Sequence, residues 1–151
     1  MSEIVWQLEY SVEADVSPTF AWNFMTDVKN WDDPPAEFTL EGPFAAGTRG
    51  TTRMPGQAGM SWYIREIVPD TFYAVEAQLD RATLWFEWRF EPVSDRRTLL
   101  KQRIILTGEN AATYVGPVEA AFGANLAPGM KRIAEAMGKP QQQAGLSEKQ
   151  R

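Results

Sequence analysis

Residues 72–108 read FYAVEAQLDRATLWFEWRFEPVSDRRTLLKQRIILTG, which is three runs of alternating apolar and polar residues separated by two turn signals. Alternation with a period of two is typical of strands that bury one face and expose the other. Asp80-Arg81 and Ser94-Asp95 supply the turns. The stretch therefore predicts two consecutive antiparallel hairpins.

The same alternation continues upstream, where further turn signals add strands to the sheet. Pro69-Asp70 and Pro55-Gly56 mark two more turns. A helix is expected from Ser17-Pro18 to about Asp27, because serine is a good N-cap and proline fits the first helical position. Residues 29–35 form a turn or a very short second helix. The remaining expected strands are residues 4–12, 38–40, 49–54 and 60–68.

Hairpin register determines which side chains share the inner face of the sheet, because directly opposite residues of antiparallel strands point to the same side. The expected pairs are Ile67–Phe72, Ile64–Val75, Leu79–Ala82, Glu87–Arg103, Trp88–Gln102 and Thr52–Trp62. The inner face then bears Thr52, Met54, Met60, Trp62, Ile64, Val75, Ala77, Phe86, Trp88, Gln102 and Ile104. The outer face carries Tyr63, Tyr73, Trp85 and Ile105.

An apolar stripe of helical periodicity follows the strands in residues 111–138. Its members recur every three or four residues: Val115, Val118, Phe122, Leu126, Met130, Ile133 and Met137. Gly123 and Pro128-Gly129 interrupt the stripe, which predicts a kink or a break. This helical segment is expected to cover the inner face of the sheet. Residues 139–151 contain few apolar side chains and are expected to form a disordered tail, so the single domain spans residues 1–138.

Composition excludes several classes of function. The 151 residues carry a formal net charge of −5, which disfavours nucleic acid and anionic lipid as partners. The absence of His and Cys removes the commonest general base, the thiol nucleophile and the usual metal ligands, so no metal and no cofactor are expected. No signal peptide and no stretch long enough to insert into a membrane is found, and a cytoplasmic location is expected.

The order of strand, two short helices, six strands and long C-terminal helix resembles the α+β helix-grip fold of the START/Bet v 1-like (SRPBCC) superfamily. In particular, the chain is similar to bacterial polyketide cyclase/dehydrase-like proteins of that superfamily. The segments that carry the resemblance are Ser17-Pro18 with Ala21-Trp22, Asp27 to Trp31, Gly42-Pro43-Phe44 with Gly47-Thr48, Trp88 to Pro92, Thr98-Leu99-Leu100, and Gly108-Glu109-Asn110. The resemblance implies a curved antiparallel sheet wrapped around a long C-terminal helix, with an elongated cavity between them. It carries over no catalytic residue.

The expected site is this cavity, lined by very large side chains beside small ones. The candidate ligand-binding residues are Thr52, Trp62, Ile64, Phe86, Trp88 and Gln102 on the sheet and Phe122 and Leu126 on the helix. Core packing alone also explains the aromatic residues. Gln102, a buried amide, either orients a ligand or satisfies a structural partner such as Thr52 or Tyr10.

Three functions fit these features. The first is binding of a small hydrophobic ligand, lipid-like or polyketide-like, inside the cavity. The second is a metal-independent enzyme of cyclase, aromatase or dehydratase type that positions such a ligand for reaction. The third is a protein-interaction module, for which the outer aromatic residues would form the surface; the same patch fits a homodimer or ordinary scattered surface aromatics. Trp31 with Asp27, Asp32 and Asp33 forms either an acidic rim near the pocket mouth or, as we prefer, a solvated turn with one packed tryptophan.

Overall fold

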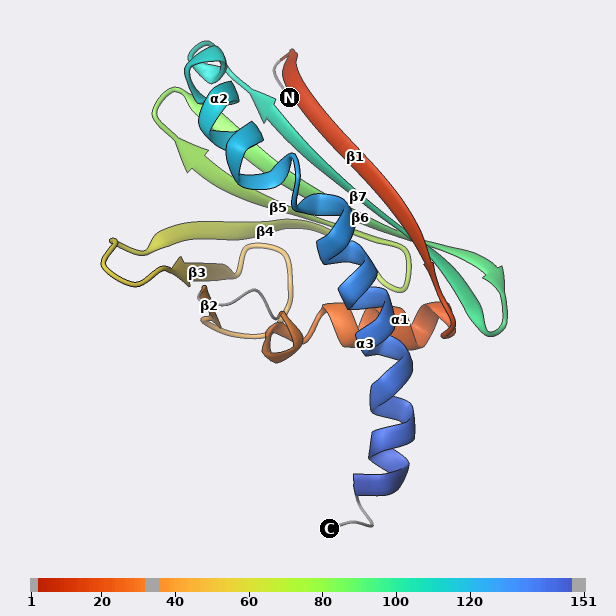
Figure 1. Ribbon diagram of the computed structural model, residues 1–151. Coiled ribbons are helices and arrows are strands. Elements are labelled where there is room, and N and C mark those ends of the chain that lie inside the picture. Colours follow the sequence, from red (N-terminus) through yellow and green to blue (C-terminus); the bar gives the residue numbers. More distant parts are fainter. Residues whose placement is uncertain (1–2, 32–35, 148–151) are drawn as a thin grey trace.

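The computed structural model describes residues 3–31 and 36–147. Within these residues the chain forms one curved seven-stranded antiparallel sheet, three α-helices and one short 3-10 helix, as the α+β helix-grip fold requires (Figure 1). The elements in chain order are β1 (Ile4–Ala14), α1 (Pro18–Met25), η1 (Val28–Asn30), β2 (Glu37–Leu40), β3 (Arg49–Arg53), β4 (Met60–Val68), β5 (Phe72–Leu79), β6 (Ala82–Ser94), β7 (Arg97–Thr107), α2 (Ala111–Phe122) and α3 (Leu126–Ser147).

The strands follow the order β1-β7-β6-β5-β4-β3-β2, so β1 and β2 are the two edges of the sheet. The two central hairpins have the predicted register: Leu79 lies opposite Ala82, and Trp88 lies opposite Gln102. The tight β5–β6 turn is possible because Arg81 adopts a left-handed backbone conformation, with φ of 56°. These hairpins fix the alternation of inner and outer side chains across the middle of the sheet.

The predicted register of β3 against β4 was wrong by two residues. Trp62 lies opposite Gly50, and Thr52 lies opposite Met60. The predicted turn at Pro55-Gly56 does form, with the Gln57 amide donating to the Met54 carbonyl at 3.1 Å, but it lies within a longer loop of residues 54–59. The turn residues therefore do not set the pairing. A shift of two residues keeps every side chain on its predicted face.

A β-bulge between Ile64 and Glu66 changes the β4–β5 hairpin. Ile67 lies opposite Tyr73 rather than Phe72, but the extra residue restores the predicted pairing of Ile64 with Val75. The prediction that Tyr73 lies on the outer face was also wrong, because Tyr73 is opposite Trp88 and shares the inner face with Val75. Tyr73 is 1% exposed and belongs to the core under the inner face.

The expected exposed patch on the outer face is also largely absent from the structure. Ile105 is fully buried, and Trp85 donates from its indole Nε1 to Thr107 Oγ1 at 3.0 Å. Beside them Arg103 makes an ion pair with Glu87 at 3.1 Å. Cross-strand packing and ion pairing thus cover these apolar groups.

Helix α1 begins as the sequence predicts and positions aromatic side chains at one end of the sheet. Ser17 Oγ accepts a hydrogen bond from the Phe20 amide at 3.1 Å, and Pro18 occupies the first turn. Trp22, on this helix, packs edge-on against Tyr73 of β5 and Phe90 of β6. This contact joins α1 to the concave side of the sheet.

The C-terminal helical segment is divided into α2 and α3 by residues 123–125 (Figure 1). The break lies at Gly123 and not at Pro128-Gly129, because a proline is tolerated in the first turn of the helix that follows. Helix α2 contacts β1 and β7, and α3 runs along β1 toward α1 (Figure 1). Helix α3 continues to Ser147, past the end at residue 138 expected from the sequence. Among the helices of the described residues, none is long and apolar enough to span a lipid bilayer.

Two polar contacts anchor α2 to the β5–β6 turn. Asn110 Nδ2 donates to the Asp80 carbonyl at 2.9 Å, and the Asp80 amide donates to the Tyr114 hydroxyl at 3.2 Å. The start of α2 is therefore held over one end of the concave face. The break after Phe122 leaves the other end of α2 without such an anchor among the described residues.

Candidate functional site

The concave face of the sheet carries no charged side chain at any position of the described strands. The strand registers identify the residues of this face, because directly opposite residues in paired antiparallel strands point to the same side of the sheet. On β1, β7, β6 and β5 they include Trp6, Leu8, Tyr10, Val12, Thr98, Leu100, Gln102, Ile104, Leu106, Leu84, Phe86, Trp88, Phe90, Tyr73, Val75 and Ala77. Such a surface suits an apolar molecule and excludes a charged one that brings no counter-ion.

Trp62 forms one wall of this face together with Gly50, Thr52 and Trp31. Its indole Nε1 donates to Thr52 Oγ1 at 3.0 Å, and its ring lies 5.4 Å from the ring of Trp31. A Cβ atom on Gly50 would lie 2.2 Å from the Trp62 ring. Only glycine therefore allows the indole to pack this close to the backbone of β3.

Trp31 is packed rather than exposed. Its indole Nε1 donates to the Met25 carbonyl at 2.7 Å, and its ring contacts Phe38 and Phe44 edge-on. Asp27 accepts from the Lys29 amide at 3.1 Å and caps η1. These contacts agree with the preferred interpretation of a turn with one packed tryptophan. The other two aspartates of the suggested acidic rim, residues 32 and 33, lie outside the described residues.

Trp88 and Tyr73 lie deeper, in the apolar core. Trp88 is 5% exposed and stacks on Phe90, with 6.2 Å between ring centroids. Burial raises the pKa of the Tyr73 phenol far above its usual range, so this hydroxyl stays protonated at neutral pH. Trp88 therefore contributes mainly to packing, and Tyr73 supplies no ionised group to the concave face.

Phe86 and Phe122 meet across the space between the sheet and the helices. Their ring centroids are 5.5 Å apart at an interplanar angle of 70°, an edge-to-face contact. Both rings are half-buried, and Phe122 is the last residue of α2. The two side chains that were predicted to face each other across a cavity are thus in contact, which closes the space between them in this conformation.

Gln102 lies on the concave face between Trp88 of β6 and Tyr10 of β1. Thr52, one structural partner suggested from the sequence, accepts from Trp62 instead. Among the described residues, neither the Gln102 amide nor the Tyr10 hydroxyl makes a side-chain hydrogen bond within the protein. Both side chains are half-buried, so their polar atoms remain accessible.

The eight predicted site residues fall into three groups. Thr52, Trp62 and Ile64 lie together on β3 and β4; Phe86, Trp88 and Gln102 lie on β6 and β7; Phe122 and Leu126 flank the break between α2 and α3. The prediction omitted the inner residues of β1, of which Leu8 and Tyr10 are opposite Ile104 and Gln102. The alternation in residues 4–12 was the available signal for them, but no hairpin turn connects β1 to β7 and so none sets their register.

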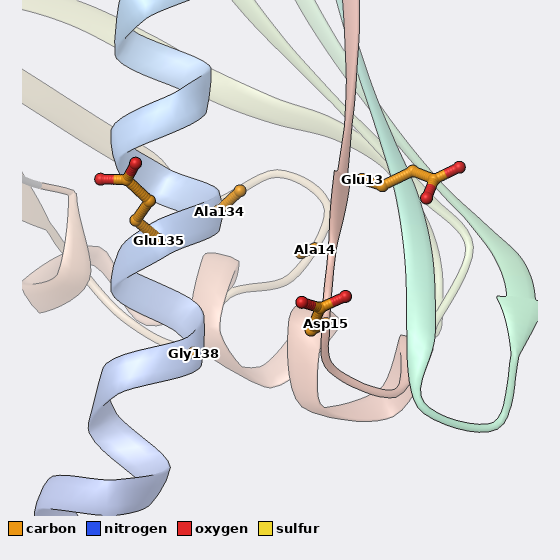
Figure 2. A pocket seen from close by; sticks show the side chains of 6 residues that line it. All are labelled: Glu13, Ala14, Asp15, Ala134, Glu135 and Gly138. Carbon is orange, nitrogen blue, oxygen red and sulfur yellow. The ribbon is translucent and has the colours of Figure 1, made fainter.

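A separate cleft of about 340 Å³ lies between the end of β1 and α3, away from the predicted cavity (Figure 2). Glu13, Ala14 and Asp15 line it from the β1 side, and Ala134, Glu135 and Gly138 line it from α3. Arg97 makes ion pairs with Glu13 at 3.1 Å and with Asp15 at 2.9 Å. Figure 2 shows the Glu13 side chain pointing away from α3. The single positive charge of Arg97 therefore offsets part of the negative charge that Glu13, Asp15 and Glu135 bring to this cleft.

Comparisons with known proteins agree with this architecture. The family described as "Polyketide cyclase / dehydrase and lipid transport" matches residues 5–142. No curated protein matches the chain. Among solved structures, Zhui aromatase/cyclase from Streptomyces sp. R1128 is 16% identical, with a TM-score of 0.72 over 93% of this chain and 98% of that one. Norcoclaurine synthase from Thalictrum flavum is 14% identical, with a TM-score of 0.67 over 89% of this chain and 87% of that one. At these identities the two structures establish the fold and no activity.

Proposed function

The chain belongs to the polyketide cyclase/dehydrase and lipid transport family, and on this basis we propose that it binds a small hydrophobic molecule between the concave face of the sheet and helices α2 and α3. The family as a whole supports ligand binding or cyclase chemistry. The observation that carries the choice of binding is the absence of charged side chains from the concave positions of the described strands.

The concave face offers few ionisable side chains for acid–base catalysis. The titratable groups at its inner strand positions are the phenols of Tyr10 and Tyr73, and Tyr73 is held protonated by burial. A binding site needs no ionisable group, because removal of apolar ligand surface from water supplies roughly 25 cal/mol per Å². Binding is therefore the simpler activity for these residues.

A cyclase- or dehydratase-type enzyme is the second candidate, and the family description supports it. Such an enzyme would act by holding a flexible chain in a reactive conformation, with the Tyr10 hydroxyl as its hydrogen-bond donor. Turnover of a poly-β-ketone by the purified protein would favour this candidate. Stable retention of an unreacted ligand would favour binding.

Entry of a ligand requires the contact between Phe86 and Phe122 to open. Phe122 ends α2 directly before the break at residues 123–125, and exposed residues make up that break. Rotation of the end of α2 about this break would withdraw the Phe122 ring from Phe86. The site is thus proposed to form as the ligand enters.

Native mass spectrometry of the purified protein, followed by titration with N-phenyl-1-naphthylamine, tests the proposal. We expect either a retained apolar mass or, after delipidation, a saturable rise in probe fluorescence at one probe per chain. A clean protein mass together with no saturable fluorescence would refute the proposal.

A matched pair of variants locates the binding on the concave face. Leu8 lies on this face, whereas its neighbour Gln7 points to the convex face and accepts from Arg103 at 3.3 Å. Leu8→Glu should weaken probe binding at least about tenfold. The new carboxylate must either lose its hydration when the probe binds or keep its water and occupy space that the probe needs. Gln7→Glu should leave it unchanged. Should Leu8→Glu fail to fold, Leu8→Gln serves with a smaller expected loss, and equal affinity in both proteins would contradict the location.

A further inference from the structure

We infer that Tyr10 and Gln102 form the polar end of the binding site, which takes one uncharged oxygen, a hydroxyl or a carbonyl, of an otherwise apolar ligand and rejects anionic ligands. The inference rests on the proposed function and adds the chemical class of the ligand to it.

Strand register brings the two side chains together. Tyr10 of β1 lies directly opposite Gln102 of β7, and opposite residues of an antiparallel pair point to the same face with Cβ atoms about 4.5–5.5 Å apart. On the other side, Gln102 is opposite Trp88, whose indole is buried. A polar pair therefore lies at the β1 edge of the sheet, beside the apolar side chains of β6.

The two threonine hydroxyls of the concave face already have partners within the protein. Thr52 Oγ1 accepts from Trp62, and Thr98 Oγ1 donates to the Val16 carbonyl at 2.9 Å. Neither Tyr10 nor Gln102 has a side-chain partner in the described part of the chain, and neither is fully buried. A phenol offers one donor and an acceptor, while an amide offers two donors and an acceptor. Together they match a hydroxyl or a carbonyl oxygen, each of which accepts from such donors.

The absence of cationic side chains from the concave strand positions explains why the site should reject anionic ligands. A ligand carboxylate or phosphate that entered this face would lose its hydration, and no lysine or arginine occupies an inner strand position to replace that hydration. Lys101 and Arg103, which flank Gln102 on β7, lie on the convex side, where they pair with Glu91 at 3.2 Å and with Glu87 at 3.1 Å. The net charge of −5 adds a further unfavourable field for anions.

Displacement of N-phenyl-1-naphthylamine by naphthalene, 1-naphthol and 1-naphthoate tests the inference, because the three competitors share one ring system. The wild-type protein should bind 1-naphthol about three- to tenfold more tightly than naphthalene, as one new hydrogen bond provides. It should bind 1-naphthoate at least about tenfold more weakly than 1-naphthol. Gln102→Leu and Tyr10→Phe should each reduce the ratio of 1-naphthol affinity to naphthalene affinity.

Gln7→Leu is the control, since it removes an amide from the convex face of the same strand. It should leave the preference for 1-naphthol intact. An unchanged preference in both site variants, or equal binding of 1-naphthoate and 1-naphthol, would overturn the inference and leave the proposed function standing. A lower melting temperature of Gln102→Leu with its preference intact would likewise assign the amide a structural role. Failure of all three competitors and of the probe itself would instead refute the proposed function.

Discussion

Replacement of Gly50 by alanine should displace the Trp62 ring from the concave face. The new Cβ would lie 2.2, 2.3 and 2.5 Å from three carbons of that ring, far inside van der Waals contact. Because the strand backbone of β3 is paired on both sides, the indole rather than the backbone is expected to move. A shift of roughly 1.5 Å restores ordinary contact.

The cost follows from what the indole loses. Overpacking in a formed core costs about 1–3 kcal/mol. A shifted ring also loses the 3.0 Å hydrogen bond to Thr52, about 0.5–1.5 kcal/mol, and its contact with Trp31, about 0.5–1.5 kcal/mol. Alanine is more favourable than glycine in a strand by about 0.5–1 kcal/mol, which offsets part of this loss. We expect Gly50→Ala to lower the free energy of unfolding by about 1–5 kcal/mol.

Urea denaturation followed by tryptophan fluorescence measures this loss. Trp62→Leu removes the clashing ring, so adding Gly50→Ala to that variant should cost nothing or stabilise it slightly. Gly138→Ala, in α3 with no atom within 4 Å of the new Cβ, is the control and should raise stability by about 0.5–1 kcal/mol. An equal cost of Gly50→Ala with and without the Trp62 ring would refute the proposed clash.

Three further substitutions test other parts of the fold. Thr98→Val should lower the free energy of unfolding by about 1–3 kcal/mol in urea titrations, because it leaves the buried Val16 carbonyl without its donor, while Thr98→Ser should retain most of the stability. Gly108→Ala should lower the melting temperature, since φ is +113° there and the new Cβ would lie 2.7 Å from Ala82 Cα; an unchanged melting curve would contradict this geometry. Phe86→Ala should cost about 2–4 kcal/mol and increase the affinity for N-phenyl-1-naphthylamine, because it enlarges the space beneath α2. A loss of stability without any gain in affinity would argue that this space does not bind ligand.

The sequence was sufficient where local turns control the geometry. Asp80-Arg81 forms a two-residue turn, so the register of β5 against β6, and the inner positions of Phe86 and Trp88, could be counted outward from it. The alternation then placed Gln102 on the same face through the next hairpin. At the centre of the sheet, the sequence therefore predicts both the strand register and the face to which each side chain points.

Prediction failed where distant contacts control the geometry. Trp62 lies opposite Gly50 because its ring needs a position without a Cβ. The turn residues of the sequence do not reveal this requirement. The bulge after Ile64 shifts the pairing of Ile67 to Tyr73. The direct contact of Phe86 with Phe122 depends on where the helical segment breaks. The sequence alone predicted a break at Gly123 and at Pro128-Gly129 equally.

Methyl NMR of the protein with N-phenyl-1-naphthylamine tests most directly whether ligands bind on the concave face. Ile104 and Ile105 are adjacent, both are fully buried, and they lie on opposite faces of β7. Leu8, opposite Ile104, extends the concave reporter group to β1. Binding as proposed predicts intermolecular NOEs from the probe to the methyl groups of Ile104 and Leu8, and none to Ile105. NOEs to Ile105, or saturable binding without any NOE to Ile104 and Leu8, would contradict it.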